Sequence, residues 1–193
     1  WDQPARMYDF YDLKGIFEGM VQGLHIEDVH YRPGEHPSLH PGKTAEILIG
    51  DTVVGMMGEL HPLVKANYEL GEPPVYVAEL DLAPILAESG ILFDVEPAPT
   101  YPPVLEDLAV VVDETIPAAA IEDVLRKGGG EYLTKIRLFD IYRGKQVGEG
   151  KKSLAFSLTY MAPDRTLTDK EVQKLRNSIV YLLDQELGAS LRS

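Results

Sequence analysis

The pattern of apolar and polar residues in the second half of the chain predicts three strands. Side chains alternate over 153–160, so that every second residue from Leu154 to Tyr160 lies on one apolar face and the small or polar residues lie on the other. Residues 107–113 form a short run rich in valine, which is typical of a buried strand. A further strand is expected over 132–142.

Two helices are predicted between and after these strands. Pro117 suits the start of the first helix, and Gly128–Gly130 ends it. Thr168 and Glu171 form a capping box that opens a second, long helix, which Gly188 ends. With a short last strand the order is β-α-β-β-α-β, which predicts a ferredoxin-like sandwich of four antiparallel strands. Both helices then cover one face of the sheet and leave the other open.

The first half of the chain predicts a helix and an antiparallel sheet, so the whole chain is α+β. Strands are expected over 45–50, 52–57 and 75–82, with Gly50-Asp51 as a hairpin turn. The helix is expected over 8–24. Its buried side is predicted to carry Leu13, Ile16, Phe17, Met20, Val21 and Leu24.

A proline-rich stretch separates the two halves. Pro97, Pro99, Pro102 and Pro103 stand within ten residues, and proline fixes φ, so an extended connector is predicted there. We place a domain boundary at this point, giving domains 1–98 and 99–193. Because the chain begins with Trp1 and not with methionine, we expect it to be an excised part of a longer protein.

The charge is distributed unevenly between the halves. The net charge is −13, but residues 1–99 hold 5 basic and 17 acidic side chains, whereas residues 100–193 hold 13 and 14. Five of the cations of the second half lie between positions 137 and 152. A basic loop beside an open sheet face suits a nucleic-acid backbone, although a solvated loop without a partner explains the same charges.

Several classes of site are not indicated by the sequence. No apolar run approaches the roughly 18 residues that span a bilayer, and no signal peptide is present, so no membrane association is expected. The chain has no cysteine, which fits a cytoplasmic protein. His36 and His40 are four residues apart, but the nearby prolines favour turns over a metal site. Because known catalytic and phosphate-loop motifs are missing, we expect neither catalytic residues nor a bound metal.

Asp140 and Tyr142 are the candidate ligand-binding residues. Strand alternation places them on one face beside the basic loop, where a tyrosine ring stacks on an unpaired base and a carboxylate accepts from base N–H groups. Ser153 at the start of the next strand adds a hydroxyl. The alternative is structural: Tyr142 packs at a strand end, and Asp140 pairs with Arg137 or Arg143.

Long motifs in both halves identify a family. In the second half, LEDLAVVVDE, LFDIYRG, GKKSLAFSLTY and DRTLTDKEV closely resemble the ferredoxin-fold anticodon-binding domain at the C-terminus of bacterial phenylalanyl-tRNA synthetase beta subunits. In the first half, DFYDLKG, LHPGKTAEI, VGMMGELHP and VYVAELDL resemble the end of the catalytic-like domain of that subunit, which has a class II synthetase fold. The resemblance covers nearly the whole chain and implies a C-terminal piece of a much longer subunit.

The resemblance implies an α2β2 enzyme that joins phenylalanine to its tRNA using ATP and Mg²⁺. Catalysis then belongs to the alpha subunit, and the catalytic-like domain of the beta subunit serves the subunit interface. The residues implied to contact the tRNA(Phe) anticodon are Asp140, Tyr142 and Ser153. Weaker candidates, for contacts with the RNA backbone, are Arg137, Arg143, Lys151 and Lys152. A second hypothesis is a protein-interaction module, in which the acidic first half carries the function and the ferredoxin-like part is a docking platform without RNA binding.

Overall fold

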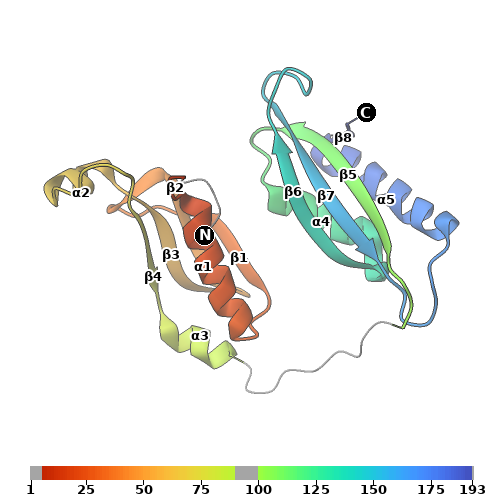
Figure 1. Ribbon diagram of the computed structural model, residues 1–193, viewed down its shortest axis with the longest axis horizontal. Helices are drawn as coiled ribbons and strands as arrows, with labels where there is room; N and C mark the ends of the chain where they lie inside the picture. Colours follow the sequence, from red (N-terminus) through yellow and green to blue (C-terminus); the bar gives the residue numbers. More distant parts are fainter. Residues whose placement is uncertain (1–5, 90–99, 193) are drawn as a thin grey trace. The chain divides into compact units, whose positions relative to one another are not determined.

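The chain divides into two compact units, unit 1 (Trp1–Val95) and unit 2 (Glu96–Ser193) (Figure 1). The computed structural model describes residues 6–89 and 100–192. Trp1 and the first half of the proline-rich connector, with Pro97 and Pro99, lie outside these described residues. Within them, no helix combines the length and the apolar character that crossing a membrane requires.

Unit 1 is built on a four-stranded antiparallel sheet with the strand order β1-β2-β3-β4. Helix α1 packs on one face of this sheet through Phe17 and Val21, which are buried with Ile47 and Met57. The elements are α1 (Phe10–Gly23), β1 (Val29–Pro33), β2 (Leu39–Ile49), β3 (Thr52–Leu60), α2 (Pro62–Asn67), β4 (Tyr76–Leu80) and α3 (Leu82–Glu88).

The helix and the three strands predicted for this half are confirmed, as is the hairpin turn at Gly50-Asp51. The prediction for Ile16 is wrong, since its side chain is 72% exposed. Phe17 lies at the centre of the buried stripe of α1. Successive residues of a helix are about 100° apart around its axis, so the side chain of Ile16 points away from this stripe and into solvent. The strand predicted over 75–82 is shorter because Asp81 caps α3, its carboxylate accepting from the N–H of Ala83 at 3.0 Å. Strand β1 and the short helices α2 and α3 were not predicted.

Unit 2 has the predicted ferredoxin-like order β-α-β-β-α-β. Its strands are arranged β6-β7-β5-β8, and all three pairings are antiparallel. The elements are β5 (Val104–Asp113), α4 (Ala118–Gly129), a short 3-10 turn (Gly130–Tyr132), β6 (Leu133–Tyr142), β7 (Lys151–Tyr160), α5 (Asp169–Leu187) and β8 (Ser190–Leu191).

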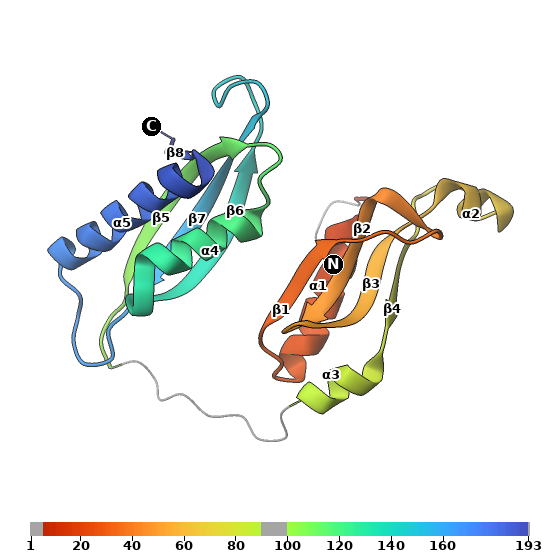
Figure 2. The same cartoon turned by 180° about the vertical axis from the view of Figure 1, so that it is seen from behind.

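The core of unit 2 lies between the sheet and its two helices. The alternating residues of β7, Leu154 to Tyr160, are at most 1% exposed and pack with Ile121 of α4 and Ile179 of α5. The helices approach closely at Gly128, where an added Cβ would lie 2.8 Å from Cα of Ile179. Figure 2 shows both helices on the near side of the sheet, and Figure 1 shows the opposite face of the same sheet without a helix over it. The open face predicted from the sequence is therefore present.

Helix α5 begins with the predicted capping box. Oε2 of Glu171 accepts from the backbone N–H of Thr168 at 2.9 Å and from its hydroxyl at 2.7 Å, and Arg165 forms an ion pair with the same carboxylate at 2.9 Å. The bond from the Thr168 backbone, with the other two contacts, lowers the pKa of Glu171 below its ordinary value of 4.5. The ionised carboxylate is therefore favoured in the folded state.

Glu171→Gln is expected to flatten the acid dependence of unit 2 stability. A carboxyl whose pKa is lowered by folding stabilises the protein above its unfolded pKa, and this contribution is lost as the pH falls through the folded pKa, hence from about pH 5 downward. Glutamine keeps an acceptor for the capping box but does not titrate. We expect the difference in melting temperature between pH 7 and pH 3.5 to be smaller for Glu171→Gln than for the unmodified chain. Equal differences would show that this carboxyl does not contribute.

Candidate nucleic-acid interface

The open face of the unit 2 sheet carries four rows of side chains that run from β6 across β7 to β5. Alternate residues of a strand face the same side of the sheet, so successive rows are two residues apart along β7 and β5. The residues that β7 contributes have only small or hydroxyl side chains. From one end to the other, the rows are Tyr142-Ser153-Val111, Asp140-Ala155-Ala109, Arg137-Ser157-Asp107 and Lys135-Thr159-Leu105.

A β-bulge in β6 determines which side chains share this face. The register shifts between Leu138 and Asp140, so that Arg137 and Asp140 face the same side although they are three residues apart. Phe139 is 51% exposed and lines a hollow on the open face together with Arg137. Strict alternation places Phe139 on the side opposite Asp140, and no feature of the sequence marks the bulge. Phe139 and Lys135 were missed for this reason.

Tyr142 lies at the end of the open face, with one side of its ring covered. The guanidinium carbon of Arg192 is 4.5 Å from the ring centroid, which is the geometry of a cation–π contact. Nη2 of Arg192 donates to Oε1 of Gln146 at 2.8 Å, and the backbone N–H of Arg192 donates to the carbonyl of Ala109 at 2.9 Å. Arg192 therefore holds the ring from the far edge of the sheet. It was not predicted because it is distant in sequence.

The loop after β6 approaches the hydroxyl of Tyr142. A Cβ added to Gly144 would lie 2.5 Å from that hydroxyl oxygen, so only glycine fits beside the ring as it stands. Arg143, between them, forms an ion pair with Glu114 at 2.9 Å. Part of the structural alternative is thus realised, because Tyr142 packs at its strand end.

Asp140 is exposed, and its carboxylate has no ion pair or hydrogen bond with any residue in the described part of the chain. The pairing with Arg137 or Arg143 considered in the alternative is not formed. An exposed carboxylate next to an aromatic ring has its acceptor sites available for N–H groups of a ligand.

The other predicted site residues lie close by but differ in accessibility. Ser153 is opposite Tyr142 and only 3% exposed, so a ligand reaches its hydroxyl only if the side chains above it move.

The basic side chains also differ in accessibility. Lys152 is 9% exposed, and its Nζ donates to the carbonyl of Glu114 at 2.8 Å. Lys151 is exposed at the start of β7. Arg137 and Lys151 are therefore better placed to reach a ligand than Arg143 and Lys152.

Unit 1 contains an open cavity of about 670 Å³ near the start of α1. Its ionisable groups are largely paired: Arg32 with Glu46 at 2.6 Å, and Lys43 with Glu59. The hydrogen bond from Lys43 lowers the pKa of Glu59. The cavity is lined by Asp9, Phe10, Tyr11, Tyr31, Arg32, Pro33, Pro41, Gly42, Lys43, Thr44, Ala45 and Tyr76. These two ion pairs hold the strands that line the cavity together.

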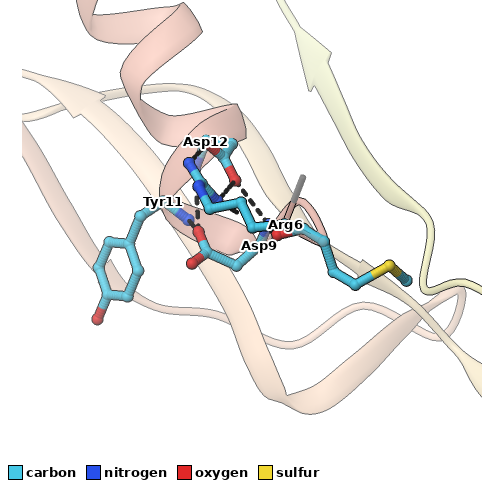
Figure 3. Close-up of polar contacts among 5 residues, drawn as sticks. Arg6, Asp9, Tyr11 and Asp12 are labelled. Carbon is cyan, nitrogen blue, oxygen red and sulfur yellow. Dashed lines mark hydrogen bonds and ion pairs between the residues drawn. The ribbon is translucent and has the colours of Figure 1, made fainter. Parts of the chain in front are cut away.

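A polar cluster fixes the start of α1 beside this cavity (Figure 3). Asp9 caps the helix by accepting from the N–H of Tyr11 at 2.8 Å, and Asp12 accepts from the N–H of Asp9 at 2.7 Å. Arg6 donates to Asp12 at 2.7 Å and lowers the pKa of that carboxyl. Figure 3 shows the ring of Tyr11 pointing away from these contacts.

Three of the histidines accept local backbone hydrogen bonds. Nδ1 of His36, His40 and His61 accepts from the N–H two residues further along, of Ser38 at 3.2 Å and of Gly42 and Leu63 at 3.1 Å. His36 precedes a turn, as expected, whereas His40 lies in β2 at an irregularity of its pairing. Over residues 6–89 and 100–192, no group of three or more potential metal ligands is found.

Comparison with known families assigns both units. Residues 99–192 match the model described as "Ferredoxin-fold anticodon binding domain", and residues 1–82 match "Phenylalanyl tRNA synthetase beta chain CLM domain". The two matches follow the same order along the chain as the two resemblances found in its motifs.

Individual relatives agree with both models. The chain is 45% identical over 185 residues to a protein of Clostridium acetobutylicum named phenylalanine–tRNA ligase beta subunit, with 95% of this chain and 23% of the relative covered. Proteins of the same name from Symbiobacterium thermophilum and Moorella thermoacetica are 44% and 47% identical, with all of this chain and 21% and 24% of the relatives covered. The chain thus spans less than a quarter of the length of these relatives.

Proposed function

Because the chain belongs to the family of phenylalanine–tRNA ligase beta subunits, we propose that unit 2 binds the anticodon region of tRNA(Phe) through its open sheet face. In this proposal Tyr142 stacks on an anticodon base and Asp140 accepts hydrogen bonds from a base edge. Ser153 contributes its hydroxyl once the side chains above it give way. Arg137 and Lys151 contact the RNA backbone, with Arg143 and Lys152 holding the neighbouring loop.

The observation that carries the proposal is the pairing of an exposed carboxylate, unpartnered among the described residues, with a positioned aromatic ring. Arg192 lies over one side of the Tyr142 ring, and the proposed stacking uses the side that Arg192 does not cover. The adjacent carboxylate of Asp140 supplies selectivity, because it accepts from some base edges and repels others. The second half of the chain has a net charge near zero, so it adds little to the repulsion that the acidic first half exerts on RNA.

For unit 1 we propose a role in the interface with the synthetase alpha subunit of an α2β2 assembly. Large apolar side chains at and before the start of α1 are exposed, among them Met7 (60%), Tyr8 (77%) and Tyr11 (72%). Such exposed side chains mark protein–protein contacts when they gather on one surface. In this proposal, residues 1–98 contact the alpha subunit in the assembly, and residues 99–193 bind tRNA.

The chemistry of the complete enzyme is assigned to other parts of it. Following the family, we propose that the assembly attaches phenylalanine to tRNA in the cytoplasm, and that ATP and Mg²⁺ are used by the alpha subunit. No catalytic residue is assigned to this chain. The alternative of an interaction module without RNA binding is not favoured, because the matching family model for unit 2 describes an anticodon-binding domain.

Fluorescence anisotropy with a labelled tRNA(Phe) anticodon stem-loop tests the proposal. We expect binding to weaken with salt, with log K falling against log salt by about 0.7 for each phosphate contacted in a single strand. A hairpin of the same length with an altered loop is the control and should bind more weakly. Binding that is equal for both hairpins, or that does not change with salt, would contradict an interface that contacts phosphates and reads the loop.

A further inference from the structure

A hollow of about 380 Å³ lies on the open face beyond the Asp140 row. It is lined by Asp107 of β5, Lys135, Arg137 and Phe139 of β6, and Ser157 and Thr159 of β7. Its floor is made of hydroxyl side chains, and an aromatic ring and two cations rise from the β6 side. Tyr142 and Asp140 are not part of it.

The cations of this hollow are available for a ligand. Neither Lys135 nor Arg137 forms an ion pair with any described residue, although Asp107 faces the same hollow. Elsewhere in unit 2 the arginines Arg143, Arg165 and Arg176 are each paired with a glutamate. Two such cations beside a half-exposed phenylalanine ring match the recognition of single-stranded nucleic acid, in which cations meet phosphates and bases stack on aromatic rings.

We propose that this hollow holds the nucleotide next to the one at Tyr142, with its base against Phe139 and its phosphate at Lys135 and Arg137. The inference rests on the proposed function of the Tyr142 end. Phe139 stands three residues from Tyr142 along β6, or about 10 Å at a rise of about 3.3 Å per residue, a separation that two neighbouring bases of a single strand reach when they are unstacked from each other. The carboxylate of Asp107 lies across the hollow on β5, where it faces the base or the ribose hydroxyl and not the phosphate.

The bulge in β6 is what brings the two subsites together. It turns Phe139 towards the open face between the Asp140 row and the Arg137 row, so that a second aromatic ring stands on the same face as Tyr142. The same bulge interrupts the ladder of the edge strand, which disfavours pairing of β6 with a strand of another protein. A bound peptide strand would depend on backbone groups of β6 and would be insensitive to the charges of Lys135 and Arg137.

The test measures affinity of the full chain for the anticodon stem-loop in a double-mutant cycle. Phe139→Ala is combined with RNA lacking the base at either neighbour of the nucleotide assigned to Tyr142. We expect Phe139→Ala to weaken binding of intact RNA by about 5- to 100-fold, and to have little effect once the correct neighbouring base is absent. Tyr181→Ala removes a comparably exposed ring (64%) from α5 and should change nothing.

Charge is tested with the double variant Lys135→Gln and Arg137→Gln. Its salt slope should be shallower by about 0.7 for each phosphate that the variant no longer binds, whereas Lys174→Gln on α5 should leave the slope unchanged.

If Tyr142→Ala weakens binding but Phe139→Ala and the charge variant do not, the hollow is not a subsite and the proposed function stands. If Phe139→Ala weakens intact and base-free RNA equally, the ring does not stack and the inference is wrong. If the wild-type chain does not distinguish the stem-loop from the control hairpin, both proposals fail.

Discussion

Tyr142→Ala is expected to weaken binding of the anticodon stem-loop by about 5- to 100-fold, since stacking of one base on an aromatic ring is worth about 1–3 kcal/mol. The loss should appear without unfolding, because the ring lies at the end of β6 and outside the core cluster of unit 2. Tyr142→Phe keeps the ring and its contact with Arg192, and we expect it to retain most of the affinity. Anisotropy titrations of the three proteins at one salt concentration provide the comparison.

The neighbouring carboxylate should act on selectivity. In an assembled α2β2 enzyme, Asp140→Ala is expected to reduce discrimination between the correct anticodon and altered ones more than it reduces affinity, because the carboxylate accepts hydrogen bonds from particular base edges. Unchanged discrimination in both Tyr142→Ala and Asp140→Ala would show that these two side chains do not read the anticodon.

Phe156→Ala is expected to destabilise unit 2 by about 3–5 kcal/mol, the usual cost of removing a fully buried phenylalanine ring from a core. Phe156 is 0% exposed and pairs with Leu108 and Leu138 on the neighbouring strands. The cores of the two units share no residue, so unit 1 should keep its stability. Hydrogen exchange followed by mass spectrometry should therefore show faster exchange in β5 and β7 and unchanged exchange in β2 and β3.

Leu105→Ala is the matched control for this prediction. Leu105 is on the open face of the same sheet and 68% exposed, so its truncation should change stability by no more than about 0.5 kcal/mol. Equal destabilisation by the two substitutions would mean that the open face is covered and that the core does not lie on the helix side alone.

The fold of unit 2 could be predicted because its local patterns agree with one another. The alternation in β7, the capping box at Thr168 and the terminating Gly188 all appear in the structure where the sequence places them. Unit 1 was less predictable. Its short helices α2 and α3 have six and seven residues, too few for an apolar period to be recognised.

The candidate site could be predicted only in part, because two of its features depend on tertiary structure. Alternation placed Asp140 and Tyr142 on one face, but the bulge that adds Arg137 and Phe139 to it depends on the pairing of β6 with β7. Arg192 directly follows the last strand, and only the tertiary fold of the sheet brings it to Tyr142. The burial of Ser153 and Lys152 likewise depends on neighbours that the local sequence does not specify.

Amide chemical-shift mapping of the full chain during titration with the tRNA(Phe) anticodon stem-loop tests the location of the interface most directly. We expect the largest changes at Asp140, Tyr142 and Ser153, smaller ones along the open face towards Arg137, and none on α4 and α5. Changes confined to the helix side of unit 2, or to unit 1, would contradict binding of the anticodon by the open face.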